Sequence, residues 1–277
     1  MRILVTGYKG FIGQHMSNYF LHKDHTVEGF EYVESVVPDV KEYDWVIHCG
    51  AISDTTEKDI DKVWKHNLEF TQRLLQVCDH FGTNIQYASS ASVYGPLKEF
   101  NETSPCLPQS PYAWSKYLFD RTIQEVGADN FNCIVQGFRY FNVYGPGEGH
   151  KGDMQSLVSK FTEQAVHKKV IKLFEGSDKF FRDCVSVYDV VATQDAMMKV
   201  DQSGIWNLGT GKAISVEEVA KLIAKKYNAE IEYIPMPDHL KGQYQEYTCA
   251  DNAKLHNTIP IRNWMTIEEY FNGQDTN

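Results

Sequence analysis

A glycine pattern directly after the first strand constrains the fold of this chain more than any other feature. The sequence opens with the short apolar run Arg2–Thr6, and glycines follow at positions 7, 10 and 13, where the next helix begins. Glycines at this spacing let the backbone turn tightly and approach a pyrophosphate at the helix N-terminus. The alternative is an ordinary glycine-rich turn, which the position directly after the first strand disfavours. We therefore expect a dinucleotide site at Gly7, Gly10, Phe11, Ile12 and Gly13.

Strands and helices alternate along the rest of the first half of the chain. Apolar runs predict strands at Thr26–Phe30, Asp44–His48, Ile85–Ala88 and Phe131–Phe138. Helical spacing of apolar residues predicts a long helix over about Asp59–Phe81, and another begins after Ser110. This alternation predicts an α/β fold, a Rossmann-type doubly wound and mainly parallel sheet.

The pattern changes after Pro146, where a polar connector leads to a helix from Met154 to about His167. We expect a dinucleotide-binding domain at residues 1–146 plus about 183–210. A smaller, mixed α/β C-terminal substrate-binding domain is expected at residues 147–182 and 211–277. In this part we expect strands at Val170–Phe174, Val185–Val187 and Ile231–Ile234, and a helix at Ile267–Phe271. Asp189 is expected to be the N-cap of the helix after the second of these strands. A turn is expected at Trp206–Gly211 and a capping box at Ser215–Glu218.

Composition excludes several classes of function. The 277 residues include 42% hydrophobic and 23% charged residues, which is ordinary for a soluble globular protein, and the formal net charge is −10. This charge disfavours a general binder of nucleic acid or acidic membranes, and no apolar run reaches membrane-spanning length. Six scattered cysteines lack metal-ligand spacing, so we expect reduced thiols, no metal and a cytoplasmic protein without a signal peptide.

Three further features extend the expected cofactor site. Glu31 ends the second strand, where an acid would accept hydrogen bonds from ribose hydroxyls and repel a 2′-phosphate. This favours NAD over NADP, although a solvated loop charge is the alternative. The small residues from Cys49 to Ser53 form a loop that we expect against the cofactor. Asn67 lies in the long apolar helix, where a structural hydrogen bond and a cofactor contact are both open.

The run Ser110–Lys116 carries the expected chemistry. Ser110 is a good N-cap and Pro111 fits the first helical position, which places Tyr112 and Lys116 on one helical face. An ammonium beside a phenol favours the phenolate, so we expect a lowered pKa for Tyr112 and an acid/base role. Ser90, which ends a strand, would donate to the same substrate oxygen. Roughly one Tyr-x-x-x-Lys is expected by chance in such a chain, so the preceding glycine motif gives this spacing its weight.

Together these motifs resemble the extended short-chain dehydrogenases/reductases. The general motifs are Thr6–Gly13, Ser89–Gly95 and the Tyr112/Lys116 pair, and the resemblance covers nearly the whole chain. Within that superfamily the chain resembles the ADP-L-glycero-D-manno-heptose 6-epimerases of lipopolysaccharide biosynthesis. The narrower match is carried by these segments: Ser53–Glu57, Phe138–Pro146, Glu148–Gly152, Leu173–Ser177, Phe181–Asp183, Ile205–Gly211 and Lys241–Tyr244.

The resemblance implies a nicotinamide-dependent epimerase that oxidises a sugar carbinol and reduces it again from the opposite face. Its implied catalytic residues are Ser90, Tyr112, Lys116 and Lys151, with Lys151 as the second acid/base. NADP or NAD, one tightly bound per chain, would be held by Gly7, Gly10, Phe11, Ile12, Gly13, Glu31, Tyr32, Cys49, Gly50, Ala51, Ser53, Asn67, Tyr112, Lys116 and Val143. The nucleotide-diphosphate sugar, with ADP-heptose favoured, would be held by Ser90, Ser92, Asn142, Phe174, Glu175, Gly176, Ser177, Arg182 and Tyr244. A homo-oligomer is expected on the same basis.

The chain also departs from the narrower family. Gly147 stands where an Arg is usual, and Asp153 and Lys160 stand where Ser and His are more frequent. The segment after the second strand is shorter and lacks lysines that favour NADP. These departures keep open a UDP- or GDP-sugar 4-epimerase, dehydratase or reductase. A dinucleotide-binding module without chemistry is a third hypothesis, which the intact Ser90/Tyr112/Lys116 set disfavours.

Overall fold

The computed structural model describes residues 1–237, 245–260 and 263–273. Its central element is a six-stranded sheet in the order β2-β1-β3-β4-β5-β9, in which every neighbouring pair is parallel. The predicted doubly wound α/β fold is therefore confirmed. The strands are β1 (Arg2–Thr6), β2 (Thr26–Phe30), β3 (Trp45–His48), β4 (Asn84–Ser90), β5 (Val135–Tyr140) and β9 (Gly204–Leu208).

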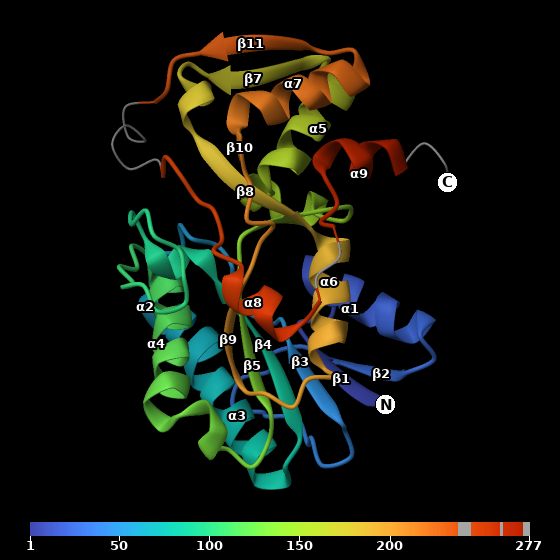
Figure 1. Cartoon of the computed structure of the whole chain (residues 1–277), viewed down its shortest axis with the longest axis vertical. Helices are drawn as coiled ribbons and strands as arrows, with labels where there is room; N and C mark the ends of the chain where they lie inside the picture. Colours follow the sequence, from blue (N-terminus) through green and yellow to red (C-terminus); the bar gives the residue numbers. More distant parts are fainter. Residues whose placement is uncertain (238–244, 261–262, 274–277) are drawn as a thin grey trace.

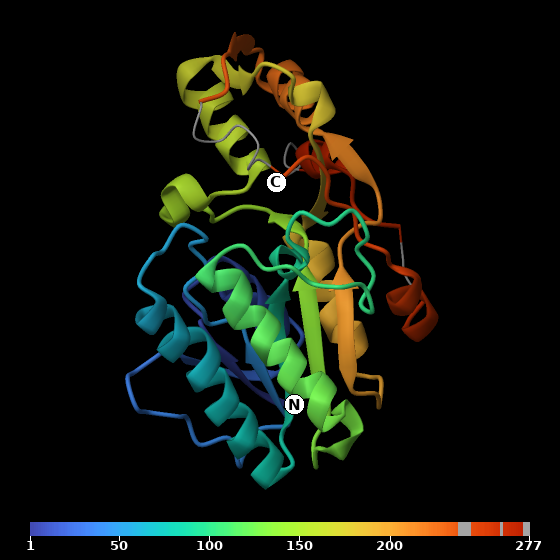
Figure 2. The same cartoon turned by 90° about the vertical axis from the view of Figure 1, so that its left-hand side faces the viewer.

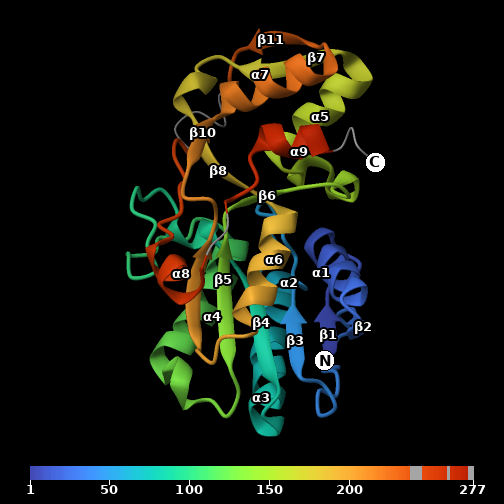
Figure 3. The same ribbon diagram turned by 45° about the vertical axis from the view of Figure 1, so that its right-hand side comes forward.

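Helices cover both faces of this sheet (Figure 3). Helices α1 (Phe11–His22) and α6 (Val187–Met197) pack on one face, where Met16, Phe20 and Val190 join a buried apolar cluster. Helices α3 (Phe70–Phe81) and α4 (Pro111–Val126) pack on the other face in a second cluster. Burial on both faces explains why strands such as β3 read as continuous apolar runs.

Smaller sheets lie beyond the carboxyl ends of the central strands (Figure 1). A three-stranded sheet has the order β10-β8-β6, from β6 (Asn142–Tyr144), β8 (Phe181–Ser186) and β10 (Ala213–Ser215). A two-stranded parallel sheet pairs β7 (Val170–Phe174) with β11 (Glu230–Ile234). A third apolar cluster includes side chains of α5 (Leu157–Lys168), α7 (Val216–Tyr227) and α9 (Ile267–Gly273). The predicted capping box at the start of α7 is confirmed, with Ser215 and Glu218 bonded reciprocally.

The long helix predicted over Asp59–Phe81 is interrupted. It starts as α2 (Ile60–Val63), passes through the π-helical segment η1 (Trp64–Glu69) and continues as α3. The remaining short elements are the 3₁₀ turns η2 (Ala91–Tyr94), η3 (Ala128–Asn130), η4 (Gly149–Met154) and η5 (Ser177–Lys179), with the short helix α8 (Ala253–Thr258).

Four other local predictions need correction. Trp206 lies in strand β9, because the segment read as a turn pairs with β5 across the sheet. Val187 begins helix α6, and its N-cap is Ser186, whose hydroxyl accepts from the Tyr188 N–H, so Asp189 is not the cap. Strand β5 begins only at Val135, four residues after the predicted start. Helix α5 begins at Leu157, since Met154 belongs to η4.

The strand order places a topological switch point between β1 and β3, where ligands bind in folds of this type. All six cysteines are free. Within the described ranges, no helix is both long enough and apolar enough to cross a membrane.

Candidate active site

The glycine turn after β1 forms the floor of the candidate cofactor site. Gly7 has a φ of +69°, and its amide is bonded to the Phe30 carbonyl at 2.8 Å. A Cβ at Gly7 would lie 2.5 Å from the Gly50 Cα, and one at Gly13 would lie 2.1 Å from the Gly7 oxygen. Because Gly10 is the N-cap of α1 and no side chain caps it, the first-turn N–H groups are available to a phosphate. The turn therefore fits a dinucleotide pyrophosphate.

A cleft of about 320 Å³ opens at this turn, outside the ends of β1 and β3. It is lined by seven of the predicted cofactor residues: Gly7, Gly10, Glu31, Tyr32, Cys49, Gly50 and Ala51. Ile52, from the loop expected against the cofactor, also lines it, and three residues absent from the prediction complete the lining: Thr6, His66 and Phe70. The lining does not include the predicted residues Phe11, Ile12, Gly13, Ser53, Asn67, Tyr112, Lys116 and Val143.

Aromatic side chains form one wall of the cleft. The rings of Tyr32 and His66 stack with centroids 3.7 Å apart, and Phe70 meets Tyr32 edge-on at 5.4 Å. Glu31 lies beside them, and its Oε1 accepts a hydrogen bond from the Lys9 N–H at 2.8 Å. The carboxylate therefore closes the glycine turn from the side where a ribose is expected.

Asn67 acts on this cleft through the backbone. Its Oδ1 accepts from the Ile52 N–H at 2.8 Å, and its Nδ2 donates to the Ile52 carbonyl at 3.0 Å and to Ser115 Oγ at 3.2 Å. Asn67 is 1% exposed, and its three hydrogen bonds favour the structural one of the two alternatives left open by the sequence. Asn67 clamps the loop after β3 to helix α4, and it does so from the π-helical segment η1.

His48 extends this buried network to the glycine turn. Its Nδ1 lies 2.6 Å from Thr6 Oγ1 and its Nε2 lies 2.8 Å from Thr71 Oγ1. Thr71 donates its own hydroxyl proton to the Asn67 carbonyl, so the His48 Nε2–H must be the donor to Thr71. Burial lowers the pKa of His48 to about 3, which keeps the ring neutral.

The residues Ser90, Tyr112 and Lys116 come together at the carboxyl end of β4. The Ser110 hydroxyl caps α4 by accepting from the Ala113 N–H at 3.2 Å, as predicted. Lys116 is 4% exposed, and its Nζ lies 6.0 Å from the centroid of the Tyr112 ring. The structure therefore juxtaposes the predicted phenol and ammonium.

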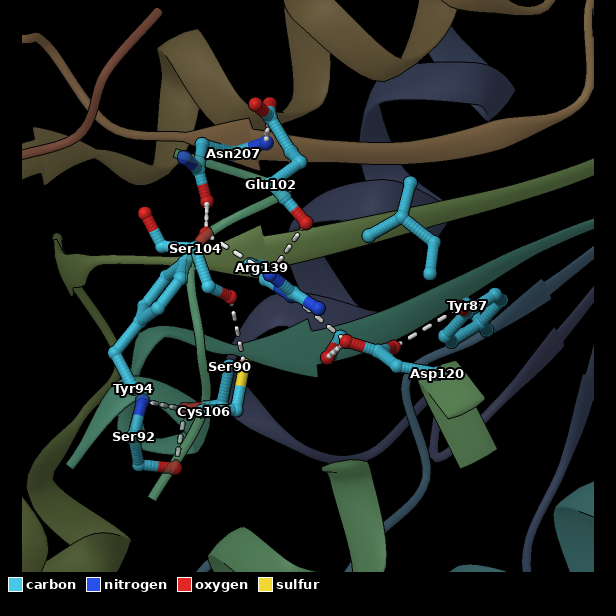
Figure 4. A network of polar contacts seen from close by, with 12 residues as sticks. Tyr87, Ser90, Ser92, Tyr94, Glu102, Ser104, Cys106, Asp120, Arg139 and Asn207 are labelled. Atoms are coloured by element: carbon cyan, nitrogen blue, oxygen red, sulfur yellow. Dashed lines mark hydrogen bonds and ion pairs between the residues drawn. The ribbon is translucent and has the colours of Figure 1, made fainter. Parts of the chain in front are cut away.

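Ser92 orients the hydroxyl of Ser90 (Figure 4). Ser90 Oγ accepts from Ser92 Oγ at 2.9 Å and from the Ser92 N–H at 3.2 Å. With its lone pairs engaged, Ser90 has its proton available, and its hydrogen bond with Tyr112 favours the phenolate. In this chain Ser92 contacts Ser90, where the resemblance implied a substrate contact.

The electrostatics of Tyr112 differ from the prediction. Burial raises the pKa of Tyr112 above its ordinary value, and the hydrogen bond with Ser90 offsets this only in part. Burial also lowers the pKa of Lys116 to about 8. The predicted lowering of the Tyr112 pKa by Lys116 is therefore wrong for the protein alone, because both groups lose solvation together.

The other predicted substrate residues lie in or next to the strands of the smaller sheets. Asn142 donates to the Asp183 carbonyl and to Thr248 Oγ1, and Arg182 Nη1 donates to the Phe181 carbonyl at 2.8 Å. Phe174 is the last residue of β7, Glu175 and Gly176 follow it, and Gly176 adopts a φ of +80°. Ser177 is 2% exposed and its hydroxyl donates to the Phe174 carbonyl. Tyr244 lies outside the described residues.

Lys151 lies in η4, at the other side of the glycine turn. Its Nζ pairs with Glu148 Oε2 at 3.0 Å and lies 4.9 Å from the centroid of the Phe11 ring. Glu148 and His66 were missed from the sequence alone. His66 directly precedes Asn67, and the π-helical turn brings it to the cleft. The spacing of apolar residues in the sequence does not predict this turn.

Comparisons with known proteins agree with this geometry. The sequence pattern of the NAD dependent epimerase/dehydratase family matches residues 31–209. The chain is 44% identical over 215 residues to an ADP-L-glycero-D-manno-heptose-6-epimerase of Brachyspira hyodysenteriae (strain ATCC 49526 / WA1), covering 76% of this chain and 68% of the relative.

Solved structures extend the likeness to nearly the whole chain. The ADP-L-glycero-D-manno-heptose-6-epimerase of Helicobacter pylori superposes with a TM-score of 0.86 at 26% identity, covering 98% of this chain and 94% of the other. The UDP-glucose 4-epimerase of Thermus thermophilus, in complex with NAD, gives a TM-score of 0.78 at 25% identity and covers 99% of each chain. The chain belongs to the NAD dependent epimerase/dehydratase family.

Proposed function

We propose that this protein is a nucleotide-sugar epimerase that acts on ADP-glycero-manno-heptose at C6″ by transient oxidation and re-reduction. The observation that carries the proposal is the pairing of the glycine-bounded cleft with the Ser90/Tyr112/Lys116 set at the same edge of the sheet. The 44% identity to a heptose epimerase supports the choice of sugar. The family description and the carboxylate of Glu31 beside the cleft support NAD as the cofactor.

The residues of the chain divide the chemistry between two proton-transfer groups. Bound nicotinamide supplies the acceptor and donor of hydride for the sugar carbon. Ser90 donates a hydrogen bond to the reacting oxygen, and Tyr112 removes its proton or returns it. Lys116, beside the Tyr112 ring, stabilises the phenolate with its positive charge. Lys151 performs the corresponding transfer for the other epimer, since each epimer must be deprotonated and reprotonated.

We assign the remaining functions by region. Residues 1–146 with about 183–210 hold the dinucleotide, and residues 147–182 with 211–277 hold the nucleotide sugar. Arg182 would bind the diphosphate, because a guanidinium matches phosphate oxygens in geometry and charge. A homo-oligomer and a cytoplasmic location follow from the resemblance.

The glycine at position 147 supports a second candidate function. This residue has a φ of +93°, and a Cβ built on it would meet no atom within 4 Å. The resemblance places an arginine here, in the expected sugar or phosphate region, and this chain lacks that side chain. A UDP- or GDP-sugar 4-epimerase, dehydratase or reductase is the alternative, and a panel of nucleotide sugars read by NMR separates the candidates.

The test of the proposal combines the native cofactor with one substitution. Mass spectrometry of the purified protein is expected to detect bound NAD. The protein should also interconvert the C6″ epimers of ADP-heptose without added cofactor. Tyr112→Phe is expected to lower turnover by about 10²–10⁴-fold, because the phenolic proton is lost while the ring remains. Circular dichroism and cofactor content check that the variant folds. Full activity of the folded variant would exclude this mechanism.

A further inference from the structure

Glu148 is a buried carboxylate to which the cofactor cleft and the glycine motif assign no role. The residue is 1% exposed, and it lies between strand β6 and the turn η4. A carboxylate is rarely buried unless hydrogen bonds or an ion pair compensate for the lost solvation. The contacts of Glu148 therefore indicate why the chain keeps an acid there.

The two oxygens of Glu148 connect three segments. Oε2 accepts from Lys151 Nζ at 3.0 Å and from the Ser156 N–H at 2.7 Å. Oε1 accepts from Ser156 Oγ at 2.6 Å and from the Gly145 N–H at 3.3 Å. Gly145 follows β6, and Ser156 is the N-cap of α5. The carboxylate is thus anchored from both sides and presents a fixed position to Lys151.

The ammonium of Lys151 is held where the glycine turn begins its helix. It lies 4.9 Å from the centroid of Phe11, the first residue of α1. The turn that carries Lys151 also reaches the segment after the Cys49–Ser53 loop, where Thr55 Oγ1 approaches Met154 Sδ at 3.9 Å. Figure 2 shows this turn above the 50–57 connection. Lys151 therefore lies beside the first turn of α1, the turn whose N–H groups are available to a phosphate.

The backbone around Lys151 provides little restraint of its own. Gly147 and Gly152 flank the turn with φ values of +93° and +51°, and a Cβ at either would meet no atom within 4 Å. A lysine side chain carries roughly 2 kcal/mol of rotamer entropy that must be offset before its ammonium is fixed. The Glu148 carboxylate and the Phe11 ring supply the contacts that fix it.

We propose that Glu148 is a positioning residue that fixes Lys151 for its acid/base work on one of the two sugar epimers. The catalytic part of this inference rests on the proposed function, whereas the fixing of the ammonium is independent of it. A purely structural role, in which Glu148 only joins β6 to α5, is the competing explanation. The two differ in whether Lys151 is affected selectively.

The first experiment measures Lys151 without any substrate. Reductive methylation followed by mass spectrometry gives the labelling rate of each lysine in the native protein and in Glu148→Gln. We expect Lys151 to label at least about three-fold faster in E148Q, because a neutral amide no longer holds the ammonium, with Lys160 as the internal reference. Glu148→Asp, which keeps the charge one methylene further away, should be intermediate. An unchanged Lys151 rate in both variants would refute the positioning role.

The second experiment separates the two half-reactions by single-turnover reduction of the bound nicotinamide, read at its absorbance band. For E148Q we expect one epimer to reduce the cofactor about as fast as in the native protein and the other to do so about 100-fold more slowly. Ser156→Ala, which removes one anchor of the Glu148 carboxylate and keeps the Lys151 pair, should slow the same epimer as E148Q by a smaller factor. The exposed Glu163→Gln is the charge control.

The outcomes distinguish the two levels of the proposal. Equal slowing of both epimers in E148Q, with faster labelling, would overturn the selective role and leave Glu148 as a structural residue. A native protein that reduces its cofactor with neither epimer would refute the proposed function, and the labelling result would still decide whether Glu148 fixes Lys151.

Discussion

At the scale of single residues, the neutral state of His48 holds the floor of the cleft together. Its two ring nitrogens bond Thr6 at the end of β1 and Thr71 in α3, and Thr71 passes the chain of hydrogen bonds to Asn67. Only the Nε2–H tautomer satisfies all of these groups. A second proton on Nδ1 would require the Thr6 hydroxyl to turn and accept, and it would place a positive charge on a fully buried ring.

We expect the free energy of unfolding to fall as the pH is lowered, because of the shifted pKa of His48. Its folded pKa of about 3 lies below the unfolded value of 6.5, so between these values the unfolded chain binds the extra proton. Stability from this group is therefore present above pH 6.5 and is lost as pH falls toward 3. Between pH 7 and pH 5 the loss is about 2 kcal/mol.

Urea denaturation of the native protein and of His48→Asn at both pH values checks this expectation. The asparagine does not titrate, so its free energy of unfolding should change by about 2 kcal/mol less between the two conditions. An identical pH dependence in the two proteins would show that His48 is protonated in the folded state.

At the scale of elements, the π-helical segment η1 is what turns Asn67 toward the loop after β3. A π-helical turn holds one residue more than an α-helical turn, which shifts the facing of every side chain beyond it. Apolar spacing predicted the helix on both sides of this segment. The extra residue was not predictable, since it is stabilised by contacts with Ile52 and Ser115, which are distant in the chain.

Asn67→Asp should loosen this clamp with little change in volume. The carboxylate still accepts from the Ile52 N–H, but it cannot donate to the Ile52 carbonyl or to Ser115, and it faces that carbonyl unfavourably. We expect a loss of about 2–3 kcal/mol in the free energy of unfolding and a faster loss of bound cofactor. Denaturation and dialysis with mass spectrometry measure the two effects. Unchanged cofactor retention would show that the loop after β3 is fixed by other contacts.

The same contrast between local and distant causes explains the other element-scale errors. The capping box at Ser215 depends on four neighbouring residues and was predicted correctly. Strand β9 depends on pairing with β5, some 65 residues earlier. The glycines that follow Leu208 made this segment resemble a turn in the sequence. The N-cap role of Ser186 was not predicted either, because the alternation of side chains through Val187 resembles a continuing strand.

At the scale of the whole molecule, a buried ion pair ties α4 to the centre of the sheet (Figure 4). Arg139 Nε donates to Asp120 Oδ2 at 2.8 Å, and both side chains are at most 1% exposed. Tyr87 donates to Asp120 and Arg139 donates to Tyr94, each at 3.0 Å. Asp120 is one helical turn beyond Lys116, so this pair anchors α4 close to the face that carries Tyr112 and Lys116.

Breaking this pair should destabilise the fold far more than breaking an exposed pair on the same helix. We expect Asp120→Asn to lower the free energy of unfolding by about 3–5 kcal/mol, because it leaves the Arg139 guanidinium buried without a counter-charge. Glu125→Gln removes the exposed partner of Arg121 and should cost less than about 1 kcal/mol. Chemical denaturation compares the two variants, and equal effects would mean that solvent reaches Arg139.

The candidate site was predictable to the extent that its motifs are local. The glycine turn and the Tyr112/Lys116 spacing are each set within a few residues, and the structure brings them to one edge of the sheet. The raised pKa of Tyr112 was not predictable, since it follows from burial that the whole fold creates. Lys151 and Glu148 are only three residues apart in the sequence. The place of their ion pair in the fold depends on the contact of Lys151 with Phe11, which is some 140 residues away.

The central claim is that hydride leaves one sugar carbon and returns to the same carbon within a single site. ADP-heptose labelled with deuterium at C6″ tests it directly, with the purified protein, no added cofactor and product analysis by NMR and mass spectrometry. We expect both epimers to retain the deuterium at C6″ in ordinary water. Loss of the label to solvent, or turnover only when cofactor is added, would contradict the claim.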